Sequence, residues 1–323
     1  MEYVKLGNTD IRVSRICVGC MSFGDSEGRF HKWILPYEET KEMIRHAISL
    51  GINFFDTANV YSEGTSEEYL GRALRELGVK RSDVVIASKV YFNEGHLSKE
   101  AIHREIDKTL CRLGTDYLDL YQIHRFDYET PMEETMEALH ELVVSGKVKA
   151  IGASAMYGYQ FHNMQEIALK HGWTLFSTMQ NHYNLLYRED ERELIPVCRQ
   201  FGVSLIPYSP LAGGHLSRPT WEGNTLRGQT DHVSRNKYDH AKDNDLEIIA
   251  KVKEIADKRG ASMSQIALAW LFAKGTNPII GSTKPYHYDE AVEALKIKLT
   301  EEEIQELEKA YLPHTIVGAL PEK

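Results

Sequence analysis

Four side chains that can donate, accept or orient a proton follow three short apolar segments of this 323-residue sequence. They are the carboxylate of Asp56, the phenol of Tyr61, the ammonium of Lys89 and the imidazole of His124. A phenol can protonate a developing alkoxide, and a neighbouring ammonium lowers the pKa of that phenol. A carboxylate holds the ammonium charged and in place, and a neutral imidazole can orient a carbonyl oxygen by hydrogen bonding. These residue types therefore predict a proton-transfer site.

Such a site requires elements that bring the four side chains together. The carboxyl ends of the strands of a parallel barrel meet at one face, where active sites are built. The segments that precede Asp56, Lys89 and His124 are 52–55, 84–88 and 119–123. An Asp–Lys pair can also serve only to balance charge, and a single Tyr or His is often part of the packing. Four such residues on consecutive β/α units favour the catalytic interpretation.

Strand and helix patterns alternate along the chain, which predicts an α/β protein with a (β/α)8 TIM barrel. A doubly wound parallel sheet is the alternative. An N-terminal β-hairpin at 3–6 and 11–14 is expected before the barrel, and extra helices are expected at the C-terminus. No linker divides the chain, so residues 1–323 are expected to form one domain. The expected barrel strands are 16–18, 52–55, 83–88, 117–123, 148–152, 177–180, 203–207 and 278–281.

Capping patterns predict where several helices begin. Thr130, Ser262 and Thr300 each stand three residues before a Glu or Gln, which is the spacing of a capping box. Pro131 is expected at the first helical position after Thr130. Gly114 follows an apolar helical stripe and is expected to end that helix.

Composition and charge exclude several classes of protein. The formal net charge is −9, and no basic run exceeds two residues, so nucleic acid is not an expected partner. No segment approaches the roughly 18 apolar residues of a membrane span, and no secretory signal is visible. Cys17 and Cys20 form a C-x-x-C pair, which could be a redox pair or half of a zinc site. Without a second ligand pair, we expect buried reduced thiols, no metal and a cytoplasmic protein.

Three long segments are expected to line the site, because long ordered loops on a barrel usually carry function. They are 21–37, 91–97 with 124–130 facing it, and 208–242. The aromatic residues in loops after strands predict an aromatic-walled substrate pocket. They are Trp33, Tyr91, Phe92, Phe126, Tyr128 and Tyr157.

Several motifs resemble those of the aldo-keto reductases. FDTANVYSEG at 55–64 and SEEYLGRAL at 66–74 look like the family signature around its aspartate and tyrosine. Ser88-Lys89 and DLYQIH at 119–124 match its lysine and histidine motifs. The resemblance runs from Leu6-Gly7 to Gly281-Ser282. GCMSFG, INFFDTAN and GASAM are most similar to a bacterial and fungal branch, the aryl-alcohol dehydrogenase-like oxidoreductases.

The resemblance implies reversible, NAD(P)H-dependent reduction of small aldehydes and ketones. Tyr61 would be the general acid, Lys89 and Asp56 would tune it, and His124 would orient the carbonyl. The implied cofactor contacts are Met21, Ser154, Gln180, Tyr208, Ser209, Leu211, Gly213, Gly281, Ser282, Lys284, His287 and Glu290. Substrate contacts are expected at Trp33, Phe92, Arg125 and Tyr157.

Three positions depart from the family pattern. Ala155 replaces the asparagine that usually follows the serine, and His287 and Ala291 replace the usual arginine and asparagine near the adenine end. Ser282, Thr283 and Lys284 nevertheless stand just before a predicted helix. Hydroxyls, an ammonium and a helix N-terminus suit a phosphate, so NADP(H) is favoured over NAD(H).

Two other functions stay open. One is a sugar-phosphate-acting enzyme on the same scaffold, with Arg125, His215 or Arg218 as anion contacts. The other is a non-catalytic nucleotide-binding regulatory subunit, because a fold alone does not guarantee activity. The sequence YDHAK at 238–242 spells the Y-x-x-x-K pair of short-chain dehydrogenases, but no glycine-rich strand–turn–helix accompanies it.

Overall fold

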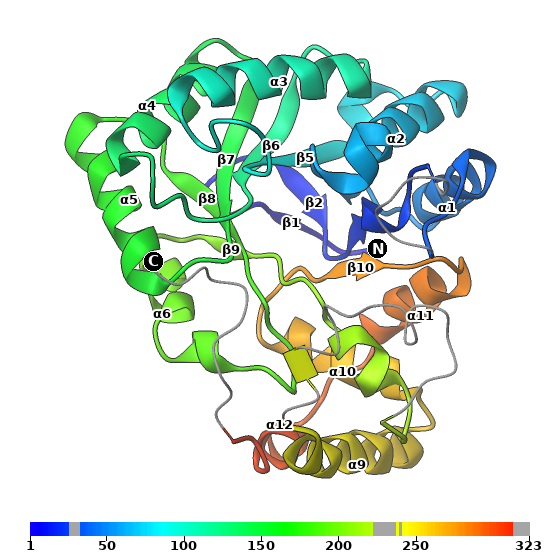
Figure 1. Ribbon diagram of the computed structural model, residues 1–323. Coiled ribbons are helices and arrows are strands. Elements are labelled where there is room, and N and C mark those ends of the chain that lie inside the picture. The colour runs from blue at the N-terminus through cyan, green and yellow to red at the C-terminus, as the bar shows by residue number, and fades with distance from the viewer. Residues whose placement is uncertain (26–32, 222–236, 239–240, 313–323) are drawn as a thin grey trace.

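Eight parallel strands curl into a barrel, with helices around its outside (Figure 1). The computed structural model describes residues 1–25, 33–221, 237–238 and 241–312. The strand order is β10-β3-β4-β5-β6-β7-β8-β9, and all of these pairs are parallel. The strands are β3 (Cys17–Gly19), β4 (Phe54–Asp56), β5 (Val85–Val90), β6 (Leu118–Ile123), β7 (Val148–Ser154), β8 (Phe176–Gln180), β9 (Ser204–Leu205) and β10 (Ile279–Gly281).

Two backbone hydrogen bonds link the outermost strands and close the barrel. The amide of Asn277 donates to the carbonyl of Leu205 at 2.9 Å, and the amide of Ile279 donates to that of Pro207 at 2.9 Å. A doubly wound sheet would reverse its strand order at a switch point, and this order does not reverse. The predicted (β/α)8 barrel is therefore confirmed.

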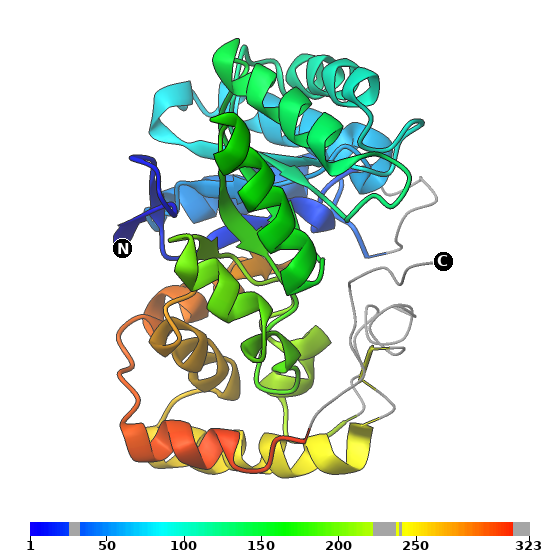
Figure 2. The same cartoon turned by 90° about the vertical axis from the view of Figure 1, so that its left-hand side faces the viewer.

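Helices between the strands form the outer layer (Figures 1 and 2). They are α1 (Tyr37–Ser49), α2 (Thr65–Glu76), α3 (Lys99–Leu113), α4 (Met132–Val144), α5 (Gly158–His171), α6 (Leu194–Gln200), α9 (Lys242–Arg259) and α10 (Met263–Ala273). The expected extra C-terminal helices are α11 (Tyr286–Ala294) and α12 (Glu301–Glu308), which follow the last strand. Short 3-10 turns are η1 (Cys20–Ser22), η2 (Tyr61–Gly64), η3 (Arg81–Asp83), η4 (Glu189–Glu191) and η5 (Ala212–Ser217).

The predicted helix ends are correct with one exception. Ser262 and Thr300 form capping boxes, and Gly114 ends α3 in the left-handed conformation. The capping box at Thr130 is wrong, because Pro131 is the N-cap of α4 and makes no side-chain cap. The Thr130 hydroxyl instead donates to Asp127 Oδ2 at 2.7 Å. It therefore stabilises the turn before α4 and does not cap the helix.

The apolar core has two parts. The larger part lies between the sheet and the helices. The smaller part fills the barrel with inward side chains from most strands, including Phe54, Val85 and Leu120, and with Ile206 directly after β9. Period-two alternation sends neighbouring residues of each strand into different parts, which explains why the strands read as continuous apolar runs.

The N-terminal hairpin covers the end of the barrel where the strands begin, at the left in Figure 2. It comprises β1 (Tyr3–Lys5) and β2 (Arg12–Ser14), and Leu6 from its turn is fully buried in the inner core. The amide of Gly7 donates to Ser204 Oγ at 2.7 Å, and Ser177 Oγ donates to Asn8 Oδ1 at 2.6 Å. Gly7 has a φ of 55°, and a Cβ there would lie 2.0 Å from the Ser177 carbonyl oxygen. The turn thus needs glycine for both its backbone and its close approach.

The two cysteines of the C-x-x-C pair lie at the first strand of the barrel, whereas Cys111 is exposed in α3. Cys17 and Cys20 are free and buried in and after β3, and burial raises the pKa of both thiols. Within the described part of the chain, no group of three or more His, Cys, Asp or Glu side chains could hold a metal ion. In the same described residues, no helix is long and apolar enough to cross a membrane.

Candidate active site

Lys89 lies at the centre of the predicted constellation. Its Nζ is 2.7 Å from Asp56 Oδ2 and 3.1 Å from the Tyr61 hydroxyl, and it also donates to the Thr57 carbonyl at 2.7 Å. The side chain of Lys89 is fully buried in β5, and Asp56 is 2% exposed at the end of β4. A buried charge requires a partner and satisfied hydrogen bonds, and these contacts supply them. Asp56, Tyr61 and Lys89, from two neighbouring strands and the turn after the first, therefore form one hydrogen-bonded group.

Burial and charge act in opposite directions on these groups. Burial raises the pKa of Tyr61 above its ordinary value, the Lys89 ammonium opposes that rise, and the Asp56 carboxylate adds to it. The lowering effect of the ammonium expected from the sequence is therefore present, but burial outweighs it. Burial by itself would lower the pKa of Lys89, but Asp56 and Tyr61 outweigh it and raise that pKa. The pair thus consists of a protonated phenol and a charged ammonium.

His124 lies beside Tyr61 at the end of β6. The two rings meet edge to face with centroids 5.8 Å apart. Burial lowers the pKa of His124 well below its usual value, and Lys89 and Arg125 act in the same direction. Its Nδ1 is buried and has no hydrogen-bond partner among the described residues. The imidazole is therefore neutral, as the proposed role in carbonyl orientation requires.

Asp56 is held by two glutamines from other strands. Its Oδ1 accepts hydrogen bonds from Gln122 Nε2 at 3.0 Å and from Gln180 Nε2 at 2.9 Å. The sequence interpretation did not include Gln122. A signal for it exists, because Leu120, Gln122 and His124 alternate along one strand and Leu120 faces the inner core. A buried amide between an inner-core leucine and the histidine predicts a polar contact inside the barrel.

The turn that carries Tyr61 adopts an unusual backbone. Ser62 and Glu63 have φ values of 48° and 57°, although neither is glycine. Such left-handed residues are uncommon and cost free energy. The Thr65 hydroxyl donates to the Ser62 carbonyl at 2.8 Å and thereby supports the turn. The turn begins with Tyr61, whose ring centroid lies 4.7 Å from Lys89 Nζ.

Residues implied at the nicotinamide end follow β7, β8 and β9. Ser154 is 1% exposed, and its hydroxyl has no hydrogen-bond partner among the described residues. The Tyr208 hydroxyl is also buried without a partner there, and burial raises the pKa of Tyr208 to about 12. The ring of Tyr208 stacks on His182 with centroids 5.2 Å apart, and Lys237 Nζ lies 4.8 Å from its centroid. A carboxamide, which both donates and accepts hydrogen bonds, would fit the orphaned hydroxyl of Ser154.

The residue after Ser154 explains part of the departure from the family pattern. Ala155 has a φ of 50°, a conformation that asparagine tolerates better than alanine. The backbone at this position therefore keeps the conformation suited to the usual asparagine, while the side chain that would contact a carboxamide is missing.

The implied phosphate and ribose contacts lie in two turns. Ser209, Ala212, Gly213 and Gly214 all have positive φ, so a run of left-handed backbone follows β9. Successive amides in such turns form concave anion sites. Leu211 belongs to the same turn, and Met21 is half-buried in η1 after β3. These positions fit a pyrophosphate-facing loop, although segments 21–37 and 208–242 lie partly outside the described residues.

The implied adenosine end lies between β10 and α11. Ser282 Oγ is 2.7 Å from His287 Nδ1 and accepts from the Lys284 amide at 2.9 Å. Burial lowers the pKa of His287, Glu290 opposes this change, and Lys284 adds to it. Lys284 itself is exposed, and Gly281 ends the strand. The turn is thus prefolded around Ser282, with the Lys284 ammonium free to meet a ligand from solvent.

The expected substrate residues do not all lie together. Phe92 is 47% exposed and meets His124 edge to face with centroids 5.0 Å apart, and Arg125 follows His124. Trp33 is buried. The predicted contact between segments 91–97 and 124–130 is confirmed, because the Leu97 amide donates to Asp127 Oδ2 at 3.1 Å.

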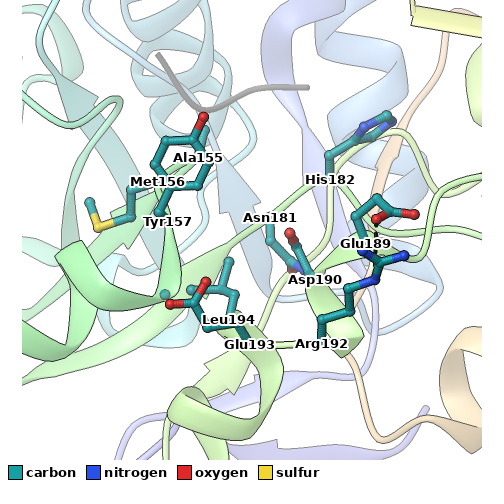
Figure 3. A pocket seen from close by; sticks show the side chains of 11 residues that line it. Ala155, Met156, Tyr157, Asn181, His182, Glu189, Asp190, Arg192, Glu193 and Leu194 are labelled. Carbon is teal, nitrogen blue, oxygen red and sulfur yellow. Dashed lines mark hydrogen bonds and ion pairs between the residues drawn. The ribbon is translucent and has the colours of Figure 1, made fainter. Parts of the chain in front are cut away.

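Tyr157 instead lines a cavity of about 110 Å³ beside the loops that follow β7 and β8 (Figure 3). Tyr157 is the N-cap of α5 and stacks on Tyr159 with centroids 6.0 Å apart. Asn181 Nδ2 donates to Asp190 Oδ2 at 2.8 Å in the same cavity. Burial raises the pKa of Asp190 to about 7 and outweighs the opposing effect of Asn181. The cavity lies outside the hydrogen-bonded group around Lys89.

Comparisons with known proteins agree with the geometry. Residues 15–312 match the Aldo/keto reductase family. Versiconal hemiacetal acetate reductase of Aspergillus parasiticus is 44% identical over 341 residues, which cover 98% of each chain. A Schizosaccharomyces pombe protein with the provisional name aryl-alcohol dehydrogenase C977.14c is 41% identical over 347 residues, again covering 98% of each chain.

A solved structure shares the fold over nearly the whole chain. It is the thermostable aldo-keto reductase Tm1743 in complex with the inhibitor epalrestat, with 32% identity and a TM-score of 0.77. The match covers 96% of this chain and 100% of that chain. The matched family, the identity to full-length relatives and the shared barrel lead to one conclusion: this chain belongs to the aldo/keto reductase family, whose members are oxidoreductases acting on carbonyl and alcohol groups.

Proposed function

We propose that this protein reduces small aldehydes and ketones with NADPH and that Tyr61 is the general acid. The observation that carries the proposal is the Lys89 ammonium, which bonds to the Tyr61 hydroxyl and the Asp56 carboxylate at once. A structural ion pair would need only the Asp–Lys contact. The added phenol, beside a neutral imidazole, is what a carbonyl reaction requires.

Each of the four residues would have a distinct role in carbonyl reduction. His124 donates a hydrogen bond that orients the carbonyl oxygen, which requires the neutral ring that its lowered pKa supplies. When bound, the nicotinamide supplies the hydride that goes to the carbonyl carbon. Tyr61 gives its proton to the oxygen as negative charge develops there. Lys89 stabilises the phenolate that remains, and Asp56 keeps Lys89 charged and aligned. The reverse sequence would oxidise an alcohol at the same site.

The raised pKa of Tyr61 is compatible with this role. A general acid must carry its proton at the working pH, and burial ensures that it does. The ammonium at 3.1 Å lowers the free energy of the phenolate once it forms. Its effect is therefore strongest when the proton moves, and such interactions accelerate the reaction.

The residues present fit a nicotinamide dinucleotide. Ser154 offers an orphaned buried hydroxyl for the carboxamide, and the turn at Ser209–Gly214 offers left-handed backbone for the pyrophosphate. Gln180 is already bonded to Asp56, so a bound carboxamide would share or displace that contact. We favour NADP(H) over NAD(H), because the exposed Lys284 at the N-terminal end of α11 suits a phosphate monoester.

Tyr61→Phe tests the assignment. The variant should lower kcat for aldehyde reduction by at least about 100-fold with an unchanged cofactor Kd, because the proton matters only as the alkoxide forms. Tyr121→Phe is the matched control. Its hydroxyl is also buried but has no hydrogen-bond partner among the described residues, so turnover should persist. Near-normal turnover in Tyr61→Phe would refute Tyr61 as the general acid. Absence of NAD(P)H oxidation by the wild type with every aldehyde would instead favour a non-catalytic nucleotide-binding protein.

A further inference from the structure

A guanidinium lies next to the carbonyl-orienting histidine. Arg125 follows His124 at the end of β6 and is half-buried. Its Nη1 donates to the His124 carbonyl at 2.8 Å, which fixes the side chain against the loop. Its Cζ lies 5.9 Å from the centroid of Phe92, and the Phe92 ring is 5.0 Å from that of His124. Imidazole, aromatic ring and guanidinium therefore adjoin one another.

The charge of Arg125 is not neutralised within the described part of the chain. Arg125 forms no ion pair with a described residue, and its recorded hydrogen bond goes to a neutral carbonyl. The acidic residue two positions later, Asp127, is engaged elsewhere. It accepts from the Leu97 amide, the Glu129 amide and the Thr130 hydroxyl. A loop that held Arg125 for stability alone would be expected to pair it with this carboxylate.

The charge of Arg125 also affects the pKa values of the proposed catalytic groups. It lowers the pKa of His124, after the larger effects of burial and Lys89, and it opposes the burial-driven rise at Tyr61 and Tyr208. Arg125 thus lies close enough to the catalytic residues for its charge to act on them. Its remaining guanidinium donors have no partner among the described residues and could bind an anionic group.

We propose that Arg125 selects substrates that carry a carboxylate, and that Phe92 supports an aromatic body between this carboxylate and the reacting carbonyl. The preferred class is accordingly an aromatic aldehyde with a ring carboxylate. This inference rests on the proposed carbonyl-reducing function of the same site. A planar guanidinium fork matches a carboxylate in two parallel hydrogen bonds. Phe92 is 47% exposed, so its ring is open to contact by a ligand.

The expected gain is moderate because Arg125 is only half-buried. A charge-assisted contact of this kind is expected to raise kcat/KM by roughly 10- to 100-fold for a carboxylate over a neutral analogue. The contact is remote from the reacting atoms and is made equally before and during the reaction. It should therefore act mainly through KM.

The experiment compares 4-carboxybenzaldehyde with its methyl ester in the wild type and in Arg125→Gln. The two aldehydes differ in intrinsic reactivity, so the informative quantity is the ratio of their kcat/KM values and its change between enzymes. Arg192→Gln is the control, because Arg192 is an exposed cation in the loop after β8 that pairs with Glu189 at 3.5 Å. It removes the same charge from the chain without touching the proposed contact.

We expect the carboxylate-to-ester ratio to fall at least about tenfold in Arg125→Gln, through KM, and to stay unchanged in Arg192→Gln. An equal loss for both aldehydes would overturn the inference, because Arg125 would then only position the loop. An unchanged ratio would overturn it as well. If the wild type reduced neither aldehyde, the proposed function itself would fail, which is a different result.

A second measurement does not depend on a folded Arg125→Gln variant. In the wild type, raising the salt concentration from about 0.02 to 0.5 M should increase KM for 4-carboxybenzaldehyde several-fold and leave KM for the ester unchanged, because salt screens partly exposed charges. Arg125→Lys should keep part of the preference, since it keeps the charge and loses the fork. A preference insensitive to salt and to this substitution would contradict a role for Arg125.

Discussion

Lys89 organises the candidate site because it contacts both the proposed acid, Tyr61, and the carboxylate of Asp56. It bonds to Asp56 and Tyr61, and it contributes to the lowered pKa of His124. A lysine that is fully buried would lose its charge without such partners. Its contribution to catalysis is therefore not separable from that of Tyr61.

The double variant of these residues tests that coupling. Lys89→Met should reduce kcat about as severely as Tyr61→Phe, by roughly 100-fold or more, and the double variant should be scarcely worse. The reason is that Lys89 acts on the reaction through the Tyr61 phenol. Single-turnover reduction rates of the three variants provide the measurement. If the two losses simply multiply, the residues act independently and the proposed coupling is wrong.

The kcat/KM for reduction should not fall at mildly acidic pH through protonation of His124. Burial lowers the pKa of His124 well below 6.5, so the ring stays neutral where an ordinary histidine gains a proton. Burial raises the pKa of Tyr61 above 10, so the phenol keeps its proton through the neutral range. We expect kcat/KM to be flat from about pH 6 to 9 and to fall above about pH 10 as Tyr61 loses its proton.

Asp190 is the necessary control for this profile, because its pKa of about 7 lies in the same range. Its carboxyl lines the neighbouring cavity, so Asp190→Asn should leave the profile unchanged. An acid limb near pH 6.5 that disappeared in His124→Gln, and not in Asp190→Asn, would show that the histidine titrates normally.

Among the elements, the turn between β10 and α11 decides the cofactor preference that we propose. Ser282 is occupied by contacts with the Lys284 backbone and His287. His287 is uncharged near neutral pH because burial lowers its pKa. The exposed ammonium of Lys284 would therefore provide most of the charge for a 2′-phosphate.

Lys284→Glu should raise KM for NADPH at least roughly tenfold and leave KM for NADH almost unchanged, because only NADPH carries the 2′-phosphate. Steady-state kinetics with both cofactors provide the measurement. Lys296→Glu makes the same charge change at an exposed position paired with Glu293, and it should affect neither cofactor. Equal responses of NADPH and NADH to Lys284→Glu, or a wild-type preference for NADH, would place the phosphate site elsewhere.

At the scale of the whole molecule, the N-terminal hairpin of β1 and β2 closes the barrel at the end where the strands begin. Leu6 is fully buried against side chains of several strands, so the hairpin and the barrel share one inner core. We therefore propose that residues 1–323 unfold as a single cooperative unit.

Leu6→Ala should lower the free energy of unfolding by about 2–5 kcal/mol, because it removes a buried side chain and leaves a cavity in a closed barrel. Val4→Ala, on the same hairpin but only partly buried, should cost less. Urea unfolding followed by near- and far-ultraviolet circular dichroism provides the measurement. Coincident single transitions are expected. Two separate transitions in the wild type would contradict a single folding unit.

The sequence by itself determined the barrel and the four central residues. Strand length, apolar runs and helical stripes are local properties, so they can be read without knowing what lies across the sheet. Asp56, Lys89 and His124 follow such runs directly, and parallel topology then brings their ends together. Helix starts at Ser262 and Thr300 were predictable for the same reason, since the capping groups lie within one turn of sequence.

Only the tertiary structure decided properties that depend on distant residues. The contacts of Gln122 and Gln180 with Asp56 span 66 and 124 residues of sequence. The Thr130 hydroxyl donates to Asp127 rather than capping α4, and Asp127 is itself held by the amide of Leu97, which is 30 residues away. The net rise of the Tyr61 pKa depends on burial by many segments at once, whereas the Lys89 effect that opposes it could be inferred from one neighbour. Local patterns place the reactive groups at the ends of strands, and the surrounding packing sets their further contacts, their charge balance and their exposure.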